Sequence, residues 1–169
     1  MTAHTAAPPP TDLIDSDLPE TALVLRQFRV VFNAVRAHFQ RVEKQVGVGG
    51  ASVWALHVIR RQPGLGVNAL ATAMDIHQST ASNLLRQLQV QGLVRTEKSE
   101  HDRRSVKIFI EASGADLLKQ VTGPYEGVLP DALKKLPPET IGQLNRNLAD
   151  LIGVLQADED AAQIPLADL

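Results

Sequence analysis

Cysteine is absent from the 169 residues, and aromatic side chains make up only 4% of them. Without cysteine the chain has no disulfide framework, no thiol-based peroxide sensor and no cysteine-ligated zinc or iron–sulfur site. No run of eighteen apolar residues occurs, and the N-terminus lacks the basic and apolar regions of an export signal. We therefore expect a cytoplasmic protein with no membrane partner.

Motifs that mark common catalytic sites are also missing. The sequence has no GxSxG, no glycine-rich phosphate loop and no HExxH. Five histidines are present, but no two of them form an HxxxH pair, so a metal-responsive protein is only a weak alternative. We expect no enzymatic activity, no cofactor and no metal site.

The formal net charge is −2, but the basic residues gather in the middle of the chain. Residues 51–112 carry eight Lys and Arg against five Asp and Glu, whereas residues 113–169 carry four against nine. A local basic surface attracts nucleic-acid phosphates even on an acidic protein, because binding releases condensed counterions. The alternative is an ordinary solvated distribution of charge.

The N-terminal part of the chain predicts a flexible arm followed by a long helix. Residues 1–20 are polar and include three consecutive prolines, which favours disorder. Over residues 21–48 the apolar positions step by three and four, as on a helix with a narrow apolar seam. A second helix is predicted with Ser52 as its N-cap and an end at Pro63. The seam residues are Leu25, Phe28, Phe32, Val35, Phe39, Val42 and Val46.

Residues 113–157 predict a second helical region. Ser113 is expected to cap a long helix that bends near Pro124 and Pro130, before a last helix with another narrow seam. Its seam residues are Ile141, Leu144, Leu148, Leu151 and Leu155. Such seams favour a homodimer, with bundling inside one chain as the alternative. The acidic tail, residues 158–169, is expected to be loose or to clip onto a partner subunit.

Residues 67–110 predict a helix-turn-helix followed by a two-stranded wing. Two β-rich runs flank a charged tip that contains Asp102, Arg103 and Arg104. A groove-reading helix beside a basic wing indicates double-stranded DNA as the partner, whereas a winged helix that binds another protein is the alternative. The spacing that packs two short helices across a turn is formed by Leu70, Ala71, Met74, Ile76, Ala81 and Leu84.

The second helix of the motif, placed at residues 78–91, presents a polar face for base and phosphate contacts. Asparagine can pair with adenine, and arginine with guanine or phosphate. The candidates for DNA binding are Gln78, Ser79, Thr80, Ser82, Asn83 and Arg86. In the wing, Arg103 and Arg104 are further candidates for DNA binding. Arg103 is expected to reach the minor groove, while Asp102 stabilises the loop by accepting hydrogen bonds from Arg104. A merely solvated helix face is the alternative.

The string QSTASNLLRQLQVQGLVR, then DRRS, then Ser113 and Gly114 resembles the multiple-antibiotic-resistance regulator (MarR) family over residues 23–155. The resemblance implies a mainly α winged helix-turn-helix with a two-stranded β wing, flanked by long N- and C-terminal dimerisation helices. The resembling domain spans residues 21–157, with a DNA-binding lobe at 51–112. It also implies a homodimer on a pseudo-palindromic operator. It maps the recognition-helix candidates other than Gln78 to DNA-reading positions, and Asp102, Arg103 and Arg104 to the wing.

Many members of this family are repressors released by a small aromatic or phenolic acid, held between the dimer helices and the winged lobe. The candidates for such an effector site are Arg36, His38, Trp54 and His57, although Trp54 could simply belong to the core. The sequence departs from the family pattern at Ile110-Glu111 and at His77, where a Ser or Thr usually caps the recognition helix. A pH effect on DNA binding through His77 is a further hypothesis.

Overall fold

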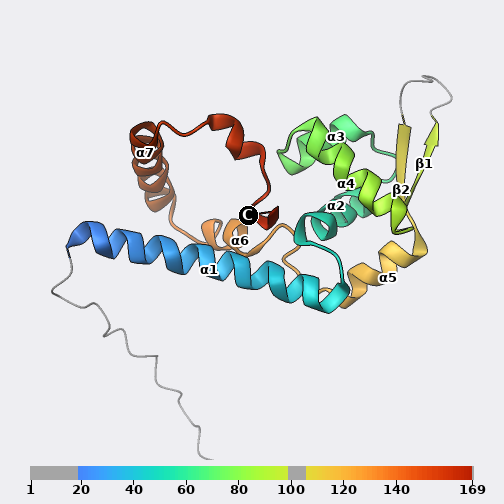
Figure 1. Cartoon of the computed structure of the whole chain (residues 1–169), viewed down its shortest axis with the longest axis horizontal. Helices are drawn as coiled ribbons and strands as arrows, with labels where there is room; N and C mark the ends of the chain where they lie inside the picture. Colours follow the sequence, from blue (N-terminus) through green and yellow to red (C-terminus); the bar gives the residue numbers. More distant parts are fainter. Residues whose placement is uncertain (1–18, 99–105, 169) are drawn as a thin grey trace, which may run out of the picture.

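The computed structural model describes residues 19–98 and 106–168, and their arrangement is mainly helical (Figure 1). The winged helix-turn-helix fold with flanking long helices, predicted from the sequence, is confirmed. The elements are α1 (Glu20–Val46), α2 (Gly50–Arg61), α3 (Val67–Met74), α4 (Gln78–Val90), β1 (Val94–Lys98), β2 (Val106–Ile110), α5 (Ala112–Gln120), α6 (Val128–Leu133), α7 (Pro138–Leu155), and the 3-10 turns η1 (Glu159–Gln163) and η2 (Leu166–Asp168). In Figure 1 the wing lies at one end of the molecule and α7 at the other.

The core lies in the winged lobe, where α2, α3 and α4 pack together. All six positions that predicted the helix-turn-helix spacing are buried. Leu56 and Ile59 of α2 and Leu88 of α4 have no exposed surface, and together they form the centre of the cluster. Burial of this apolar surface, which contributes roughly 25 cal/mol per Å², fixes the orientation of α4.

The wing is an antiparallel pair in which Val94 lies opposite Ile110 and Lys98 opposite Val106. Its second strand is tied to the loop after α2, because the Gly64 amide donates to the Ile108 carbonyl at 2.8 Å and the Ile108 amide donates to the Leu65 carbonyl at 3.0 Å. The wing is therefore anchored on the lobe rather than projecting from it freely.

Three local predictions are wrong. Ser52 does not cap the second helix, which starts three residues earlier than predicted, with Gly49 as its N-cap. Ser113 lies inside α5, where its hydroxyl donates to the Gly92 carbonyl at 2.6 Å instead of capping the helix. The predicted long bent helix is two separate helices, because α5 ends at Gln120 and α6 starts only at Val128, beyond Pro124.

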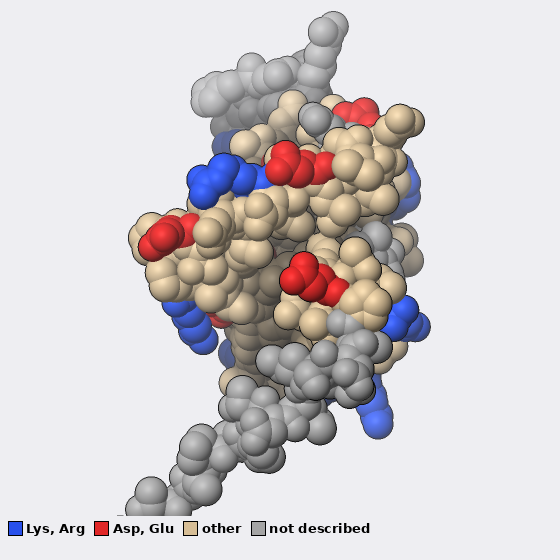
Figure 2. Space-filling model, turned by 90° about the vertical axis from the view of Figure 1, so that its left-hand side faces the viewer, with Lys and Arg blue, Asp and Glu red and all other residues tan. Residues whose placement is uncertain are grey.

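The narrow apolar seams predicted for α1 and α7 differ in how much of their surface is buried. In α1, Val35, Phe39 and Val42 are buried, whereas Leu25 and Phe32 remain half exposed. Helix α7 has no buried residue, and its five seam positions are 37–65% exposed. Figure 2 views this end of the molecule, where uncharged residues cover most of the surface and charged side chains are scattered.

The acidic tail is folded and contacts other parts of its own chain. After α7 it forms η1 and η2, and η2 contacts both α1 and α2. Pro165 is buried, and Ala167 packs against the core cluster. The expectation of a loose tail is therefore corrected to a segment folded back on the same chain (Figure 1), whereas a contact of this segment with a partner subunit stays a prediction.

Candidate nucleic-acid interface and adjacent pocket

Helix α4 separates its apolar and polar residues in the way that the sequence predicted. Ala81, Leu84, Leu85 and Leu88 are buried, while Gln78, Ser79, Asn83 and Arg86 are exposed and Thr80 and Ser82 are partly exposed. The six candidate DNA-reading side chains thus share the outer side of one rigid helix. This geometry suits insertion into a major groove.

Hydrogen bonds on this face fix some of the candidate side chains before any ligand binds. The Arg86 guanidinium donates to the Asn83 side-chain oxygen at 3.0 Å, which orients both groups one turn apart. The Ser82 hydroxyl donates back to the Gln78 carbonyl at 2.8 Å, so it retains only its acceptor capacity. Asn83 and Arg86 are therefore better placed than Ser82 to donate to a base edge or a phosphate.

The start of α4 carries no side-chain cap. His77 occupies the N-cap position, and its side chain makes no hydrogen bond to the first turn. The amides of that first turn lack partners within the helix, and the helix dipole favours an anion there. A phosphate oxygen could take the place of the missing cap.

In the wing, the described arginine side chain is held by ion pairs and by an aromatic ring. Arg95 in β1 pairs with Glu97 at 3.0 Å and with Glu111 at 3.7 Å, and its guanidinium lies 4.8 Å from the centre of the Phe109 ring. These contacts assign Arg95 to holding the wing together. The predicted wing residues Asp102, Arg103 and Arg104 lie outside the described residues.

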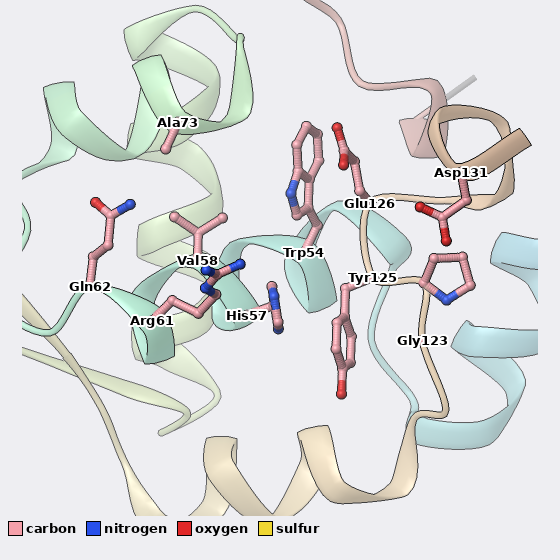
Figure 3. Close-up of a pocket in the computed structure, with 11 residues that line it drawn as sticks. Trp54, His57, Val58, Arg61, Gln62, Ala73, Gly123, Tyr125, Glu126 and Asp131 are labelled. Carbon is pink, nitrogen blue, oxygen red and sulfur yellow. The ribbon is translucent and has the colours of Figure 1, made fainter. Parts of the chain in front are cut away.

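A hollow of about 590 Å³ lies between the winged lobe and the helical region (Figure 3). Helix α2 supplies Trp54, His57 and Arg61, while the segment after α5 supplies Tyr125 and Glu126. The remaining lining residues are Val58, Gln62, Ala73, Gly123, Pro124 and Asp131. Its volume falls in the range of small-molecule sites. In Figure 3 the aromatic rings lie between Arg61 on one side and the Glu126 and Asp131 carboxylates on the other.

A stacked pair of rings forms one wall of this hollow. His57 and Tyr125 have ring centroids 4.2 Å apart, and the Arg60 guanidinium lies 5.7 Å from the Tyr125 centroid. Arg60 also donates to the His57 Nδ1 atom at 3.3 Å. Burial lowers the pKa of His57 first of all, and the positive charges of Arg60 and Arg61 lower it further. His57 is thereby favoured as a neutral hydrogen-bond acceptor.

Only two of the four predicted effector residues line this hollow. Trp54 and His57 do, whereas Arg36 is exposed on α1 and His38 is buried elsewhere, with its Nε2 atom 3.1 Å from the Pro124 carbonyl oxygen. Burial lowers the pKa of His38, while the hydrogen bond to Pro124 raises it and Arg41 lowers it. His38 therefore has a structural partner already.

Sequence reasoning missed the charged residues of the hollow, Arg61, Glu126 and Asp131. It also placed Tyr125, the single tyrosine of the chain, on the apolar face of a helix that does not form there. Arg61 is the last residue of α2 and could have been found from the sequence. It follows Arg60 and lies about one helical turn after the candidate His57. Glu126 and Asp131 come from the irregular segment and from the short helix that follows it, so no helical spacing relates them to Trp54.

Two further features are absent from the part of the chain that the structure describes. Within residues 19–98 and 106–168, no three His, Asp or Glu side chains come together as metal ligands. None of the helices in these two ranges is long and apolar enough to span a membrane.

Comparison with known proteins gives the same fold, and part of the chain matches a family model. A sequence model described as the MarR family matches residues 46–105. The chain is 29% identical over 125 residues to a Thauera aromatica protein assigned as a putative transcriptional regulatory protein for the hcr operon, covering 72% of this chain and 74% of that one.

Solved structures agree with this assignment at the level of fold. A MepR-like protein in complex with pseudoligands superposes with a TM-score of 0.57 at 14% identity, covering 82% of this chain and 97% of that one. The S. aureus MepR in its DNA complex superposes with a TM-score of 0.54 at 22% identity, covering 82% and 99%. The fold and the exposed recognition helix define a winged-helix DNA-binding protein. More specifically, residues 46–105 of the chain match the MarR family of transcription regulators.

Proposed function

We propose that this protein is a cytoplasmic repressor that binds a pseudo-palindromic operator as a homodimer and is released from it by a small aromatic acid. The observation that carries the DNA-binding part is the outer face of α4, where Asn83 and Arg86 are exposed and held in register by their mutual hydrogen bond. The middle segment that bears this face has more basic than acidic residues, which supports attraction to phosphates.

The unpartnered seam of α7 supports the homodimer. Five leucine and isoleucine side chains lie along one side of this helix with more than a third of their surface exposed, and the first half of α1 exposes Leu25 and Phe32 as well. A contiguous apolar surface of this kind is typical of an interaction site. A two-fold axis would pair these faces and would present two copies of α4 to successive major grooves.

Selection from random duplexes tests the DNA-binding proposal. Purified protein is incubated with random duplex DNA, and the bound fraction is sequenced at low salt and at about 0.15 M salt. We expect a two-fold symmetric site with half-sites about one helical turn apart. Absence of any enriched site at both salt concentrations would contradict the proposal and would favour a winged helix that binds another protein.

The lining of the hollow supports an effector with two polar ends. A ring can pack against Trp54 and Tyr125, a carboxylate can pair with Arg61, and a phenolic hydroxyl can donate to Glu126 or Asp131. The hollow borders both α2 of the winged lobe and α6 of the helical region. A ligand that fits one relative position of these parts better than another shifts the population between them.

Fluorescence of Trp54, the single tryptophan of the chain, gives a direct test of the effector site. The probe is 4-hydroxyphenylacetate, and 2-(4-hydroxyphenyl)ethanol is the matched compound without the carboxylate. We expect quenching by the acid at lower concentration than by the alcohol, and loss of this difference in Arg61→Gln. Arg36→Gln, on α1 outside the hollow, is the matched control and should keep the difference. Equal binding of acid and alcohol would contradict the role of Arg61.

A further inference from the structure

The segment that follows α7, residues 157–168, folds back across the molecule, and we call it the strap. Gln156 ends α7 in a left-handed conformation with φ of 50°, which turns the chain away from the helix axis. The Asp158 carboxylate then accepts a hydrogen bond from the Asp160 amide at 3.0 Å and starts η1. The reversal is thus built from specific local interactions, because few residues other than glycine adopt a positive φ.

The strap is attached to the body of the protein more closely than the helix that precedes it. Pro165 is buried, Ala167 packs against the core cluster, and η2 contacts both α1 and α2. Helix α7 has no buried residue. The strap therefore holds on to α1 of the helical region and α2 of the winged lobe together, and it spans the boundary between these two parts (Figure 1).

The same segment reaches the helix-turn-helix. Gln163 borders a hollow of about 390 Å³ together with Asn68 and Thr72 of α3, Asp75 of the turn, and Gln78. Gln78 is the first residue of α4 and one of the candidate DNA-reading positions. Through Gln163 the strap therefore borders the same hollow as the first residue of the recognition helix, whose uncapped first-turn amides favour an anion.

The negative charge of the strap is unfavourable for DNA binding near the start of α4. Residues 157–168 contain no Lys or Arg, and the side chains of Asp158 and Asp160 at the start of η1 are acidic and exposed. Phosphates that approach the start of α4 meet like charge from this neighbouring segment, and this repulsion weakens with salt. Any rotation of the winged lobe relative to α1 would have to break the contacts of Pro165 and Ala167.

We propose that the strap is an intrachain brake on DNA binding. In its docked position it holds the winged lobe in one orientation and places negative charge near the phosphate path, and operator DNA displaces it. This inference rests on the proposed DNA binding. It adds a control that acts without any small molecule and through a different surface from the hollow lined by Trp54.

Three proteins test the brake. Ala167→Glu places a charge at the packed end of the strap and should undock it. Ala162→Glu adds the same charge at an exposed strap position and is the matched control. A chain that stops after Gln156 lacks the strap altogether. Affinity for the selected operator duplex is measured by fluorescence anisotropy at about 0.15 M salt, and amide hydrogen exchange of the strap is measured with and without the duplex.

We expect Ala167→Glu and the shortened chain to bind the operator at least about fivefold more tightly than the full chain, and Ala162→Glu to bind no more tightly. Strap amides should be protected in the free full chain and lose protection in Ala167→Glu and on adding DNA. Affinities of both variants within twofold of the full chain, weaker binding by both, or an unprotected strap in the free full chain would each overturn the brake. If the full chain binds no duplex at all, the proposed function fails instead.

Discussion

The ring of His57 on α2 lies stacked on the ring of Tyr125, with an interplanar angle of 20°, and the contact joins the winged lobe to the segment leading to α6. Burial lowers the pKa of His57 from its ordinary value of 6.5, and Arg60 and Arg61 lower it further. The unfolded chain therefore takes up a proton at His57 at a higher pH than the folded chain does. We predict that the free energy of unfolding decreases as the pH falls below 6.5.

Urea denaturation between about pH 7.5 and about pH 5 measures this effect. His57→Phe keeps an aromatic ring against Tyr125 but cannot titrate, so its stability should fall less steeply with acid. Some dependence should remain, because burial also lowers the pKa of His38. His77→Gln removes an imidazole that makes no capping bond and serves as the control. An identical acid dependence in the parent chain and in His57→Phe would show that His57 does not contribute.

Arg86 should contribute to DNA affinity through its positive charge, since its hydrogen-bond partner on α4 is the neutral Asn83 side chain. We predict that Arg86→Ala weakens operator binding by about 1–3 kcal/mol if Arg86 reads a base, and lowers the salt slope by about 1 if it binds a phosphate. Anisotropy titrations at several salt concentrations distinguish these cases. Arg26→Ala removes the same charge from α1 and should change neither quantity; equal losses in both variants would indicate a nonspecific charge effect.

Gly114 should be intolerant of any side chain, because a Cβ there would collide with the Leu93 carbonyl oxygen and lie 3.0 Å from Ile110. Backbone cannot move as a flexible side chain does, so Gly114→Ala is expected to destabilise the fold by about 1–3 kcal/mol. Gly153→Ala in α7 meets open space and should stabilise its helix by up to about 1 kcal/mol. Thermal denaturation compares the two. A neutral Gly114→Ala would mean that the start of α5 can shift away from the wing.

The sequence was most informative where short-range spacing and tertiary packing agree. The buried positions of α3 and α4 followed from apolar periodicity, since the turn between these helices leaves little freedom in their packing. The segment after Gln120 was misjudged because its apolar residues kept a helical spacing while Pro124 prevented the helix. The hollow could not be predicted as a site, because Arg61 and Asp131 are far apart in the sequence and only the fold brings them to the same cavity.

Leu148 lies midway along the exposed seam of α7, where it is 40% exposed in the single chain. If this seam is the dimer interface, Leu148→Glu places a charge in an apolar contact and should yield a monomer. Loss of one recognition helix from the complex should reduce operator affinity about 100-fold or more, because the second half-site is no longer held at high effective concentration.

Analytical ultracentrifugation and anisotropy measure the two consequences on the same samples. Ala149→Glu adds the same charge at the neighbouring exposed position, about 100° around the helix from Leu148, and should remain dimeric with full affinity. Circular dichroism should give equal helix content for both variants, since no residue of α7 is buried in the single chain. A dimeric Leu148→Glu would place the interface elsewhere, whereas a monomer that still binds the operator at full affinity would mean that one recognition helix suffices.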